Sequence, residues 1–95
     1  MENINTIIEI GSFSIKTIIY SNLDNNPKIE GIGKSNTQGY NGNEINSFDE
    51  FIDSIKKSIV QAEKQANIII KECYVLFSNK SIKINKFKNS ISLDG

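Results

Sequence analysis

The fold of this chain is decided by the stretch TIIEIGSFSIKTIIY, residues 6–20. Residues 6–10 form a short, nearly continuous apolar run, which is the pattern of a strand buried in a sheet. The next four residues, 11–14, include glycine and two serines and predict a tight turn. Residues 15–20 then predict a strand that returns beside the first. The chain therefore opens with an antiparallel hairpin.

The hairpin is expected to continue into a third strand. Residues 24–27, DNNP, have the composition of a second turn. Residues 28–33 alternate with period two and predict the third strand. Three strands joined by tight turns make an antiparallel meander. From residue 34 to residue 46 the chain is polar and rich in glycine and asparagine, so we expect an ordered loop there.

One long helix is expected after this loop. Ser47 and Glu50 have the spacing of a capping box: the Ser47 hydroxyl accepts from the Glu50 amide, and the Glu50 carboxylate reaches back to the Ser47 amide. Asp49 adds negative charge where the helix dipole favours it, and Asn67 is the expected end. The apolar residues recur at steps of three and four, which places them on one stripe that covers a face of the sheet. They are Phe48, Phe51, Ile52, Ile55, Ile59, Ala62 and Ala66.

Strands are expected again after the helix. Residues 68–70 lead into the dense apolar segment 73–77, which predicts a central strand. Its Cys73 is expected to pack as a small hydrophobic side chain, because the chain has no histidine to act as the base of a cysteine nucleophile. Residues 81–85 and 89–93 alternate cleanly and predict half-exposed strands. No helix follows them, so we expect an open sheet edge, an uncovered apolar face and a fold that continues past residue 95.

The fold class is therefore α/β (α+β): a three-stranded antiparallel meander, one long covering helix and further strands. Ninety-five residues form one small domain, and 11 lysines balance 11 acids, which argues against a strongly basic nucleic-acid binder. One cysteine and no histidine exclude a disulfide framework, a Cys/His zinc site and a histidine-based triad. No apolar run approaches the ~20 residues of a membrane span. We recognise no secretory leader, so a cytoplasmic location is expected.

The neutral total hides an uneven charge distribution. Residues 1–55 hold three lysines and eight acids, a net charge of −5, whereas residues 56–95 hold eight lysines and three acids, a net charge of +5. The second half either presents a basic surface to an anionic partner or simply carries solvated lysines. Phe87 is the one aromatic residue among its last lysines, so a base-stacking surface is not expected, and no nucleic-acid partner is assigned.

The first turn is the best candidate for chemistry. Glu9 lies near the end of a buried strand, and Gly11 and Ser12 follow it in a tight hairpin. Glycine lets a phosphate approach the backbone, and the Ser12 hydroxyl and successive amides can donate to phosphate oxygens. The Glu9 carboxylate can hold water on Mg²⁺, and Lys16 returns on the second strand as a point charge. The alternative is a purely structural turn. The glycine spacing fits neither a P-loop nor a dinucleotide fingerprint.

Short motifs follow one another along most of the chain. They are Ile8-Glu9-Ile10-Gly11-Ser12, Gly31-Ile32-Gly33, Thr37-Gln38-Gly39, Gln61-Ala62-Glu63, and Tyr74-Val75-Leu76 with Ser78 and Ile82. In this order and with these intervals, from about Ile7 to Leu93, the chain resembles the start of the FtsA family of actin-like cell-division proteins. No single motif decides this resemblance; the series carries it.

The resemblance implies an actin/hexokinase-type ATPase fold, of which this chain is the N-terminal portion. Residues 1–83 would form the N-terminal half of the first subdomain, and residues 84–95 would begin the inserted FtsA-specific subdomain, which stays incomplete. The implied cofactors are ATP and Mg²⁺, with Glu9 near the metal through water. No catalytic residue is assigned, and at most a weak ATPase activity is expected, in the complete protein. The cofactor-binding residues would be Glu9, Gly11, Ser12, Phe13 and Lys16.

The resemblance also implies a role in cell division, as an ATP-binding protein that links the FtsZ ring to the cytoplasmic membrane at the septum. FtsZ and other division proteins would be partners, and the complete protein would self-associate into filaments. A region outside this chain would reach the membrane, which places the protein at the cytoplasmic face of the inner membrane at the division site. Two alternatives stay open: another actin-like ATPase, such as a pilus-assembly protein, or a stand-alone interaction module that binds no nucleotide.

Overall fold

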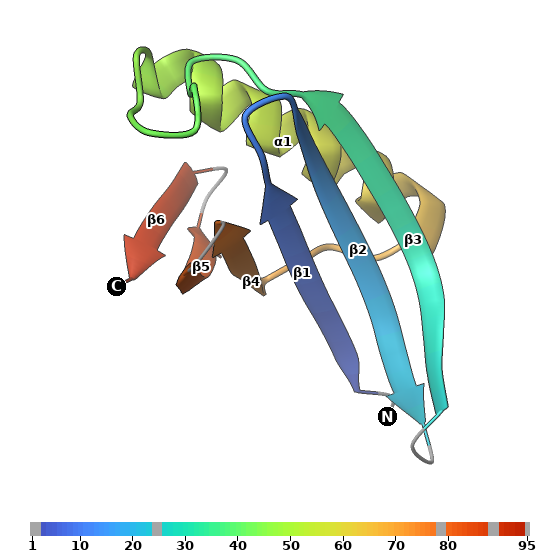
Figure 1. Cartoon of the computed structure of the whole chain (residues 1–95). Coiled ribbons are helices and arrows are strands. Elements are labelled where there is room, and N and C mark those ends of the chain that lie inside the picture. Colours follow the sequence, from blue (N-terminus) through green and yellow to red (C-terminus); the bar gives the residue numbers. More distant parts are fainter. Residues whose placement is uncertain (1–2, 24–25, 78–79, 88–89, 95) are drawn as a thin grey trace.

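A computed structural model describes residues 3–23, 26–77, 80–87 and 90–94, with side chains for residues 3–22 and 26–77. In these ranges six strands form one sheet in the order β3-β2-β1-β4-β5-β6, and one helix lies against it (Figure 1). The mixed α/β class expected from the sequence is confirmed. In chain order the elements are β1 Ile4–Ile10, β2 Ser14–Leu23, β3 Asn26–Asn36, α1 Phe48–Ala66, β4 Glu72–Phe77, β5 Lys80–Phe87 and β6 Ser90–Asp94.

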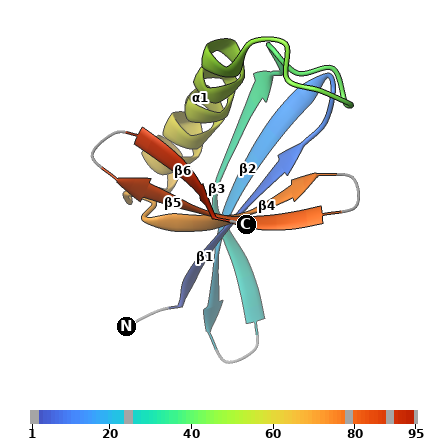
Figure 2. The same cartoon turned by 90° about the vertical axis from the view of Figure 1, so that its left-hand side faces the viewer.

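The first three strands form the expected antiparallel meander. β2 is antiparallel to β1 on one side and to β3 on the other, with a register shift in the second pair between Ile19 and Tyr20. Of the turn expected at 24–27, residues 24 and 25 lie outside the described part of the chain, and Asn26 and Pro27 already belong to β3. β2 and β3 form a long twisted hairpin (Figures 1 and 2).

The loop expected from residue 34 begins later than the sequence indicated. β3 continues to Asn36, because Lys34 and Ser35 extend its ladder opposite Lys16 and Ile15 of β2. Pairing with a neighbouring strand overrides the polar composition of these residues. The loop proper covers residues 37–47 and contains one isolated bridge, between Tyr40 and Ile45.

The ends of α1 follow the predicted capping with one exception. The Ser47 hydroxyl accepts from the Glu50 amide at 3.3 Å, as expected of the N-cap. The predicted return contact, from the Glu50 carboxylate to the Ser47 amide, is wrong: that amide donates to the Gly39 carbonyl at 3.2 Å. Gly39 adopts a positive φ of 74°, which turns the loop back over the start of the helix. Asn67 ends the helix in the left-handed region, as predicted.

Most of the predicted apolar stripe of α1 faces the core. Ile52 and Ala66 pack against that core as partly buried side chains. Phe48 does not belong to it: its side chain is 54% exposed, because Phe48 is the first residue of the helix and precedes its first buried residue, Phe51. The buried apolar residues, from the helix, the sheet and the segment after the helix, are Ile8, Ile10, Ile15, Ile19, Phe51, Ile55, Ile59, Ala62, Ile70, Cys73 and Val75. Cys73 thus packs as the small hydrophobic side chain that the sequence predicted.

Two serines on the buried face of α1 were not expected there. Ser58 donates to the Gly33 carbonyl at 3.2 Å, and its oxygen lies 2.7 Å from the Thr17 hydroxyl. Ser54 donates to the Glu50 carbonyl and accepts from the Gln38 amide. These bonds satisfy hydroxyls that would otherwise be costly to bury. They also connect the helix to β2, to β3 and to the loop that follows β3.

α1 approaches β3 closely because β3 has glycines under the helix. A Cβ at Gly33 would overlap the backbone carbonyl oxygen of Ser58, and a Cβ at Gly31 would overlap that of Ala62. The absence of side chains at these two positions lets the helix backbone rest on the strand. The Gly31-Ile32-Gly33 motif of the sequence is therefore a helix-packing site.

β4 lies beside β1 and runs parallel to it, with Ile7 opposite Tyr74 and Glu9 opposite Leu76. It is central, as predicted, because β5 pairs with its other side and β6 then pairs antiparallel with β5. β4, β5 and β6 are turned steeply from the direction of β1, β2 and β3 (Figure 2). Residue 89 of the last predicted strand lies outside the described residues, and residues 90–93 belong to β6.

The sheet face opposite α1 carries the uncovered apolar surface that was expected. The register places Ile32, Ile18, Ile7 and Tyr74 opposite one another across β3, β2, β1 and β4. Ile32 is 41% and Tyr74 is 54% exposed.

Two glutamines from α1 cover part of the outer edge of β3. The Ile32 amide donates to Gln65 Oε1 at 2.7 Å, and the Lys34 amide donates to Gln61 Oε1 at 2.6 Å. These amides would otherwise be open to pairing with a strand of another molecule.

We expect the double substitution Gln61→Leu/Gln65→Leu to lower the free energy of unfolding by about 1–2 kcal/mol, because two backbone hydrogen bonds are lost. The freed edge should also increase aggregation, measured by light scattering beside a urea titration. The matched control is Gln61→Glu/Gln65→Glu, which keeps an acceptor oxygen at both positions. Equal stability and equal scattering of the two double variants would contradict this role of the glutamines.

Candidate functional site

The candidate site is built on the hairpin between β1 and β2. Glu9 and Lys16 are direct partners across this hairpin, and both side chains are exposed. Ile8 and Ile10 on either side of Glu9 are buried under α1, so alternation along the strand turns Glu9 to the opposite face of the sheet. The hairpin thus presents a carboxylate and an ammonium group side by side on its uncovered face.

A second cation, which the sequence reasoning missed, continues this row. Lys34 of β3 is the direct partner of Lys16 on β2, so its side chain lies on the same face. The order across the sheet is Lys34, Lys16, Glu9 and then Leu76 of β4. No local pattern around Lys34 could have revealed this position, because it depends on the register of β3.

Thr37 holds the turn, residues 11–14, in place through two hydrogen bonds. The Gly11 amide donates to the Ser14 carbonyl at 3.0 Å, which closes the turn. The Thr37 hydroxyl donates to the Gly11 carbonyl at 2.8 Å, and its amide donates to the Phe13 carbonyl at 3.0 Å. Within the described part of the chain the backbone amides of Ser12 and Phe13 have no hydrogen-bond acceptor. The turn therefore has two available backbone donors, while the carbonyls of Gly11, Phe13 and Ser14 already accept hydrogen bonds.

A shallow open hollow of about 380 Å³ lies beside the turn. Of the predicted site residues, Glu9, Gly11 and Lys16 line it, whereas Ser12 and Phe13 do not. Phe13 is 87% exposed and points away from the core, and Ser12 lies against Gly42 of the loop after β3. The complete lining is Glu9, Ile10, Gly11, Ser14, Lys16, Leu76 and Phe77.

β4 supplies an apolar wall of the hollow that the sequence reasoning also missed. Leu76 and Phe77 reach the hollow because β4 runs parallel to β1 and ends beside the turn. Phe77 is held by an aromatic cluster: its ring centroid lies 5.8 Å from that of Tyr40 and 6.4 Å from that of Phe51. Tyr40 and Phe51 stack on each other at 5.0 Å. Packing against Tyr40 and Phe51 therefore holds the Phe77 side chain in place beside the hollow.

The donor groups of the site suit a phosphate with a hydrated divalent cation. Two lysines and two backbone amides offer positive charge and hydrogen-bond donors, and Glu9 offers one carboxylate. Mg²⁺ is commonly held by one or two carboxylates, phosphate oxygens and several waters, which one glutamate can serve. Among the residues that the structure describes, no three His, Cys, Asp or Glu side chains group together as metal ligands. The same part of the chain contains no helix long and apolar enough to span a membrane.

Comparisons with known proteins add to this picture. The chain matches no established protein-family profile. It is 26% identical over 88 residues, 93% of this chain and 20% of the relative, to the cell division protein FtsA of Enterococcus hirae. It is 38% identical over 76 residues, 79% of this chain and 18% of the relative, to the cell division protein FtsA of Buchnera aphidicola from Schizaphis graminum. The Buchnera protein from Acyrthosiphon pisum with the same name is 36% identical over 76 residues.

The resemblance to the N-terminal portion of FtsA is thereby confirmed. The chain spans about a fifth of the length of the curated relatives it matches.

Proposed function

We propose that this chain is the N-terminal portion of an FtsA-like cell-division protein and that the turn between β1 and β2 is its first phosphate loop. The observation that carries this proposal is the arrangement at the hairpin. Glu9 and Lys16 face each other beside a turn whose Ser12 and Phe13 amides are unoccupied, in a chain that matches FtsA proteins over most of its length. The whole fold would be of the actin/hexokinase type.

Each group of the site has a separate part in holding ATP with Mg²⁺. Lys16 and Lys34 would balance phosphate charge from the strands, and the Ser12 and Phe13 amides would donate to phosphate oxygens from the turn beside the hollow. The Ser12 hydroxyl could join them only by turning away from Gly42, against which the Ser12 side chain lies. Glu9 accepts hydrogen bonds from water on the metal. The bound nucleotide would supply a phosphoanhydride whose presence or hydrolysis can change the protein's shape. None of these side chains is assigned to bond cleavage, and any ATPase activity would belong to the complete protein.

Thr37 positions this loop without touching the ligand. Its two hydrogen bonds occupy the Gly11 and Phe13 carbonyls, whose negative ends would otherwise be free to turn toward the phosphates. A phosphate loop of this kind needs its amides, not its carbonyls, facing the anion. The Thr37-Gln38-Gly39 motif would then orient the phosphate loop without contacting the nucleotide.

The wider role of the protein is proposed from the same relatives. It would link the FtsZ ring to the cytoplasmic membrane at the septum, bind other division proteins and self-associate into filaments. Membrane contact would come from a region outside these 95 residues, and the location would be the cytoplasmic face of the inner membrane at the division site. Residues 1–83 would belong to the first subdomain and residues 84–95 to the inserted one, so that β5 would run from one into the other.

The division role is tested on the native product. An antibody against residues 47–66 captures that product from the source cells, and we expect FtsZ to be captured with it. We also expect an intact mass several times 10.6 kDa, since the relatives are several times longer than this chain. A long product without FtsZ would favour another actin-like ATPase, such as a pilus-assembly protein. A product near 10.6 kDa without FtsZ would favour a stand-alone interaction module.

A further inference from the structure

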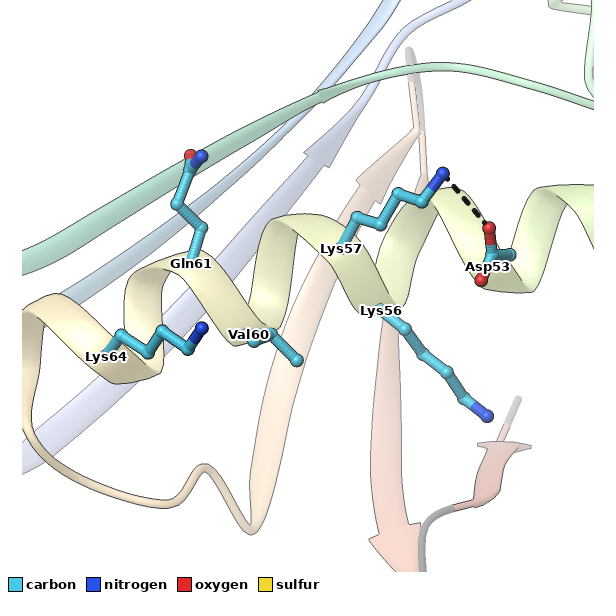
Figure 3. A pocket seen from close by; sticks show the side chains of 6 residues that line it. All are labelled: Asp53, Lys56, Lys57, Val60, Gln61 and Lys64. Atoms are coloured by element: carbon cyan, nitrogen blue, oxygen red, sulfur yellow. Dashed lines mark ion pairs between the residues drawn. The ribbon is translucent and has the colours of Figure 1, made fainter.

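A second hollow, on the outer face of α1, has a composition unlike that of the candidate phosphate site. It has a volume of about 450 Å³ and is lined by Asp53, Lys56, Lys57, Val60, Gln61 and Lys64. All six side chains come from consecutive turns of the helix (Figure 3). Val60 lies among the charged groups and is 45% exposed, so the hollow combines an apolar contact with three ammonium groups.

The polar groups of this hollow are almost all hydrogen-bond donors. Lys57 pairs with Asp53 at 3.3 Å, but both side chains are about two-thirds exposed, at 69% and 65%, so this pair is weak. Lys56 and Lys64 form no ion pair within the described part of the chain. Figure 3 shows Lys56 pointing away from the side of the helix to which Gln61 points.

Gln61 adds a donor with a fixed direction. Its Oε1 accepts from the Lys34 amide of β3 at 2.6 Å, which anchors the side-chain amide. Figure 3 shows Gln61 pointing toward the ribbon of β3. The NH₂ group of the anchored amide makes no hydrogen bond within the described part of the chain and can donate to a ligand. The hollow therefore favours a ligand that brings acceptor oxygens, as carboxylates do, together with an apolar group for Val60.

The charges around the hollow limit the shape of such a ligand. Asp49, Glu50 and Asp53 occupy the first turns of the same helix, directly before the lysines. An extended polyanion, such as nucleic acid or an anionic membrane surface, would meet these acids as well as the lysines, and like charges in apposition oppose binding. A short acidic segment can occupy the basic half of the helix alone.

We propose that this hollow docks a short acidic peptide segment of a partner protein, with one apolar side chain against Val60 and carboxylates on Lys56 and Lys64. The docking site lies on α1 and shares no residue with the hollow beside the turn. Docking therefore does not depend on nucleotide binding. Its affinity should be modest and should fall with salt, because exposed ion pairs supply most of the attraction.

The test uses the protein at its native length and a fluorescein-labelled peptide with glutamates on both sides of one leucine. Fluorescence anisotropy should show saturable binding, and Lys56→Glu/Lys64→Glu should raise the Kd by about tenfold, since two attractions become repulsions. The matched control is Lys28→Glu/Lys71→Glu, which makes the same change in net charge at exposed lysines away from the hollow and should leave the Kd unchanged. Circular dichroism verifies that both variants keep their helix.

Three results would overturn the proposal. They are no saturable binding of the peptide, an equal rise in Kd for both lysine pairs, and tighter binding of phosphatidylglycerol vesicles or duplex DNA with the same dependence on Lys56 and Lys64. The NMR signals of isotopically dimethylated lysines give a readout that does not require a substitution. The peptide should shift the signals of Lys56 and Lys64 and leave those of Lys28 and Lys71 in place.

Discussion

Gly33→Ala is expected to lower the free energy of unfolding by about 3 kcal/mol or more, the upper range for forcing extra atoms into a packed interior. The added Cβ would overlap the Ser58 carbonyl oxygen and would also lie 2.8 Å from the Ala62 amide nitrogen. Both atoms belong to the helix backbone, so no side-chain rotation can relieve the overlap. The helix must move away from β3 as a whole. Urea unfolding followed by circular dichroism at the helix band measures the loss.

The expected loss of unfolding free energy is larger than the steric strain at residue 33 alone. Several hydrogen bonds between α1 and the sheet also require the close approach of the helix to β3. Moving α1 outward stretches the Ser58 bonds to Gly33 and Thr17 and the Gln61 bond to Lys34. Buried hydroxyls left without partners add their own cost.

The matched control for this prediction is Gly11→Ala, the same change at a glycine outside the helix contact. A Cβ there would lie 3.4 Å from the Ser14 carbonyl oxygen, which is an ordinary contact, so we expect stability within about 0.5 kcal/mol of the parent. If Gly33→Ala were as stable as Gly11→Ala, the close packing of α1 on β3 would be refuted.

The second large effect that we expect is a loss of affinity for ATP when residues of the turn between β1 and β2 are substituted. We expect Glu9→Ala and Gly11→Val each to weaken ATP binding with Mg²⁺ by at least about tenfold, which corresponds to about 1.4 kcal/mol. Glu9→Ala removes the carboxylate that would hold the water on the metal, and Gly11→Val places a branched side chain where the proposed phosphates would approach the backbone. Binding is measured with a fluorescent ATP analogue on the protein at its native length, because this chain spans about a fifth of the length of the relatives it matches.

Two comparisons make this prediction specific. Glu9→Ala should weaken binding with Mg²⁺ more than binding with the metal chelated, whereas Gly11→Val should weaken both alike. Lys71→Ala removes one positive charge from an exposed residue outside the site and should leave the affinity unchanged. Unaltered affinity in both Glu9→Ala and Gly11→Val would remove this turn from the nucleotide site, whatever the partners of the protein are.

Local sequence patterns determined the elements of this protein. The apolar runs at residues 6–10 and 15–20, separated by a small polar turn, specified the first hairpin, and the Ser47 cap with the stripe behind it specified α1. Such patterns suffice because turn preference, capping and amphipathic period act between residues a few positions apart. The same locality explains why Glu9, Gly11 and Lys16 could be grouped in advance: one hairpin carries all three.

Tertiary structure alone decided how those elements meet. β4 is parallel to β1 across more than 60 residues of chain, and only this pairing brings Leu76 and Phe77 to the hollow beside the turn. The burial of Ser58 follows from the glycines of β3, and the anchoring of the turn by Thr37 follows from the path of the loop after β3. Contacts between distant segments depend on register and on the space that side chains leave, and no short window of sequence records either.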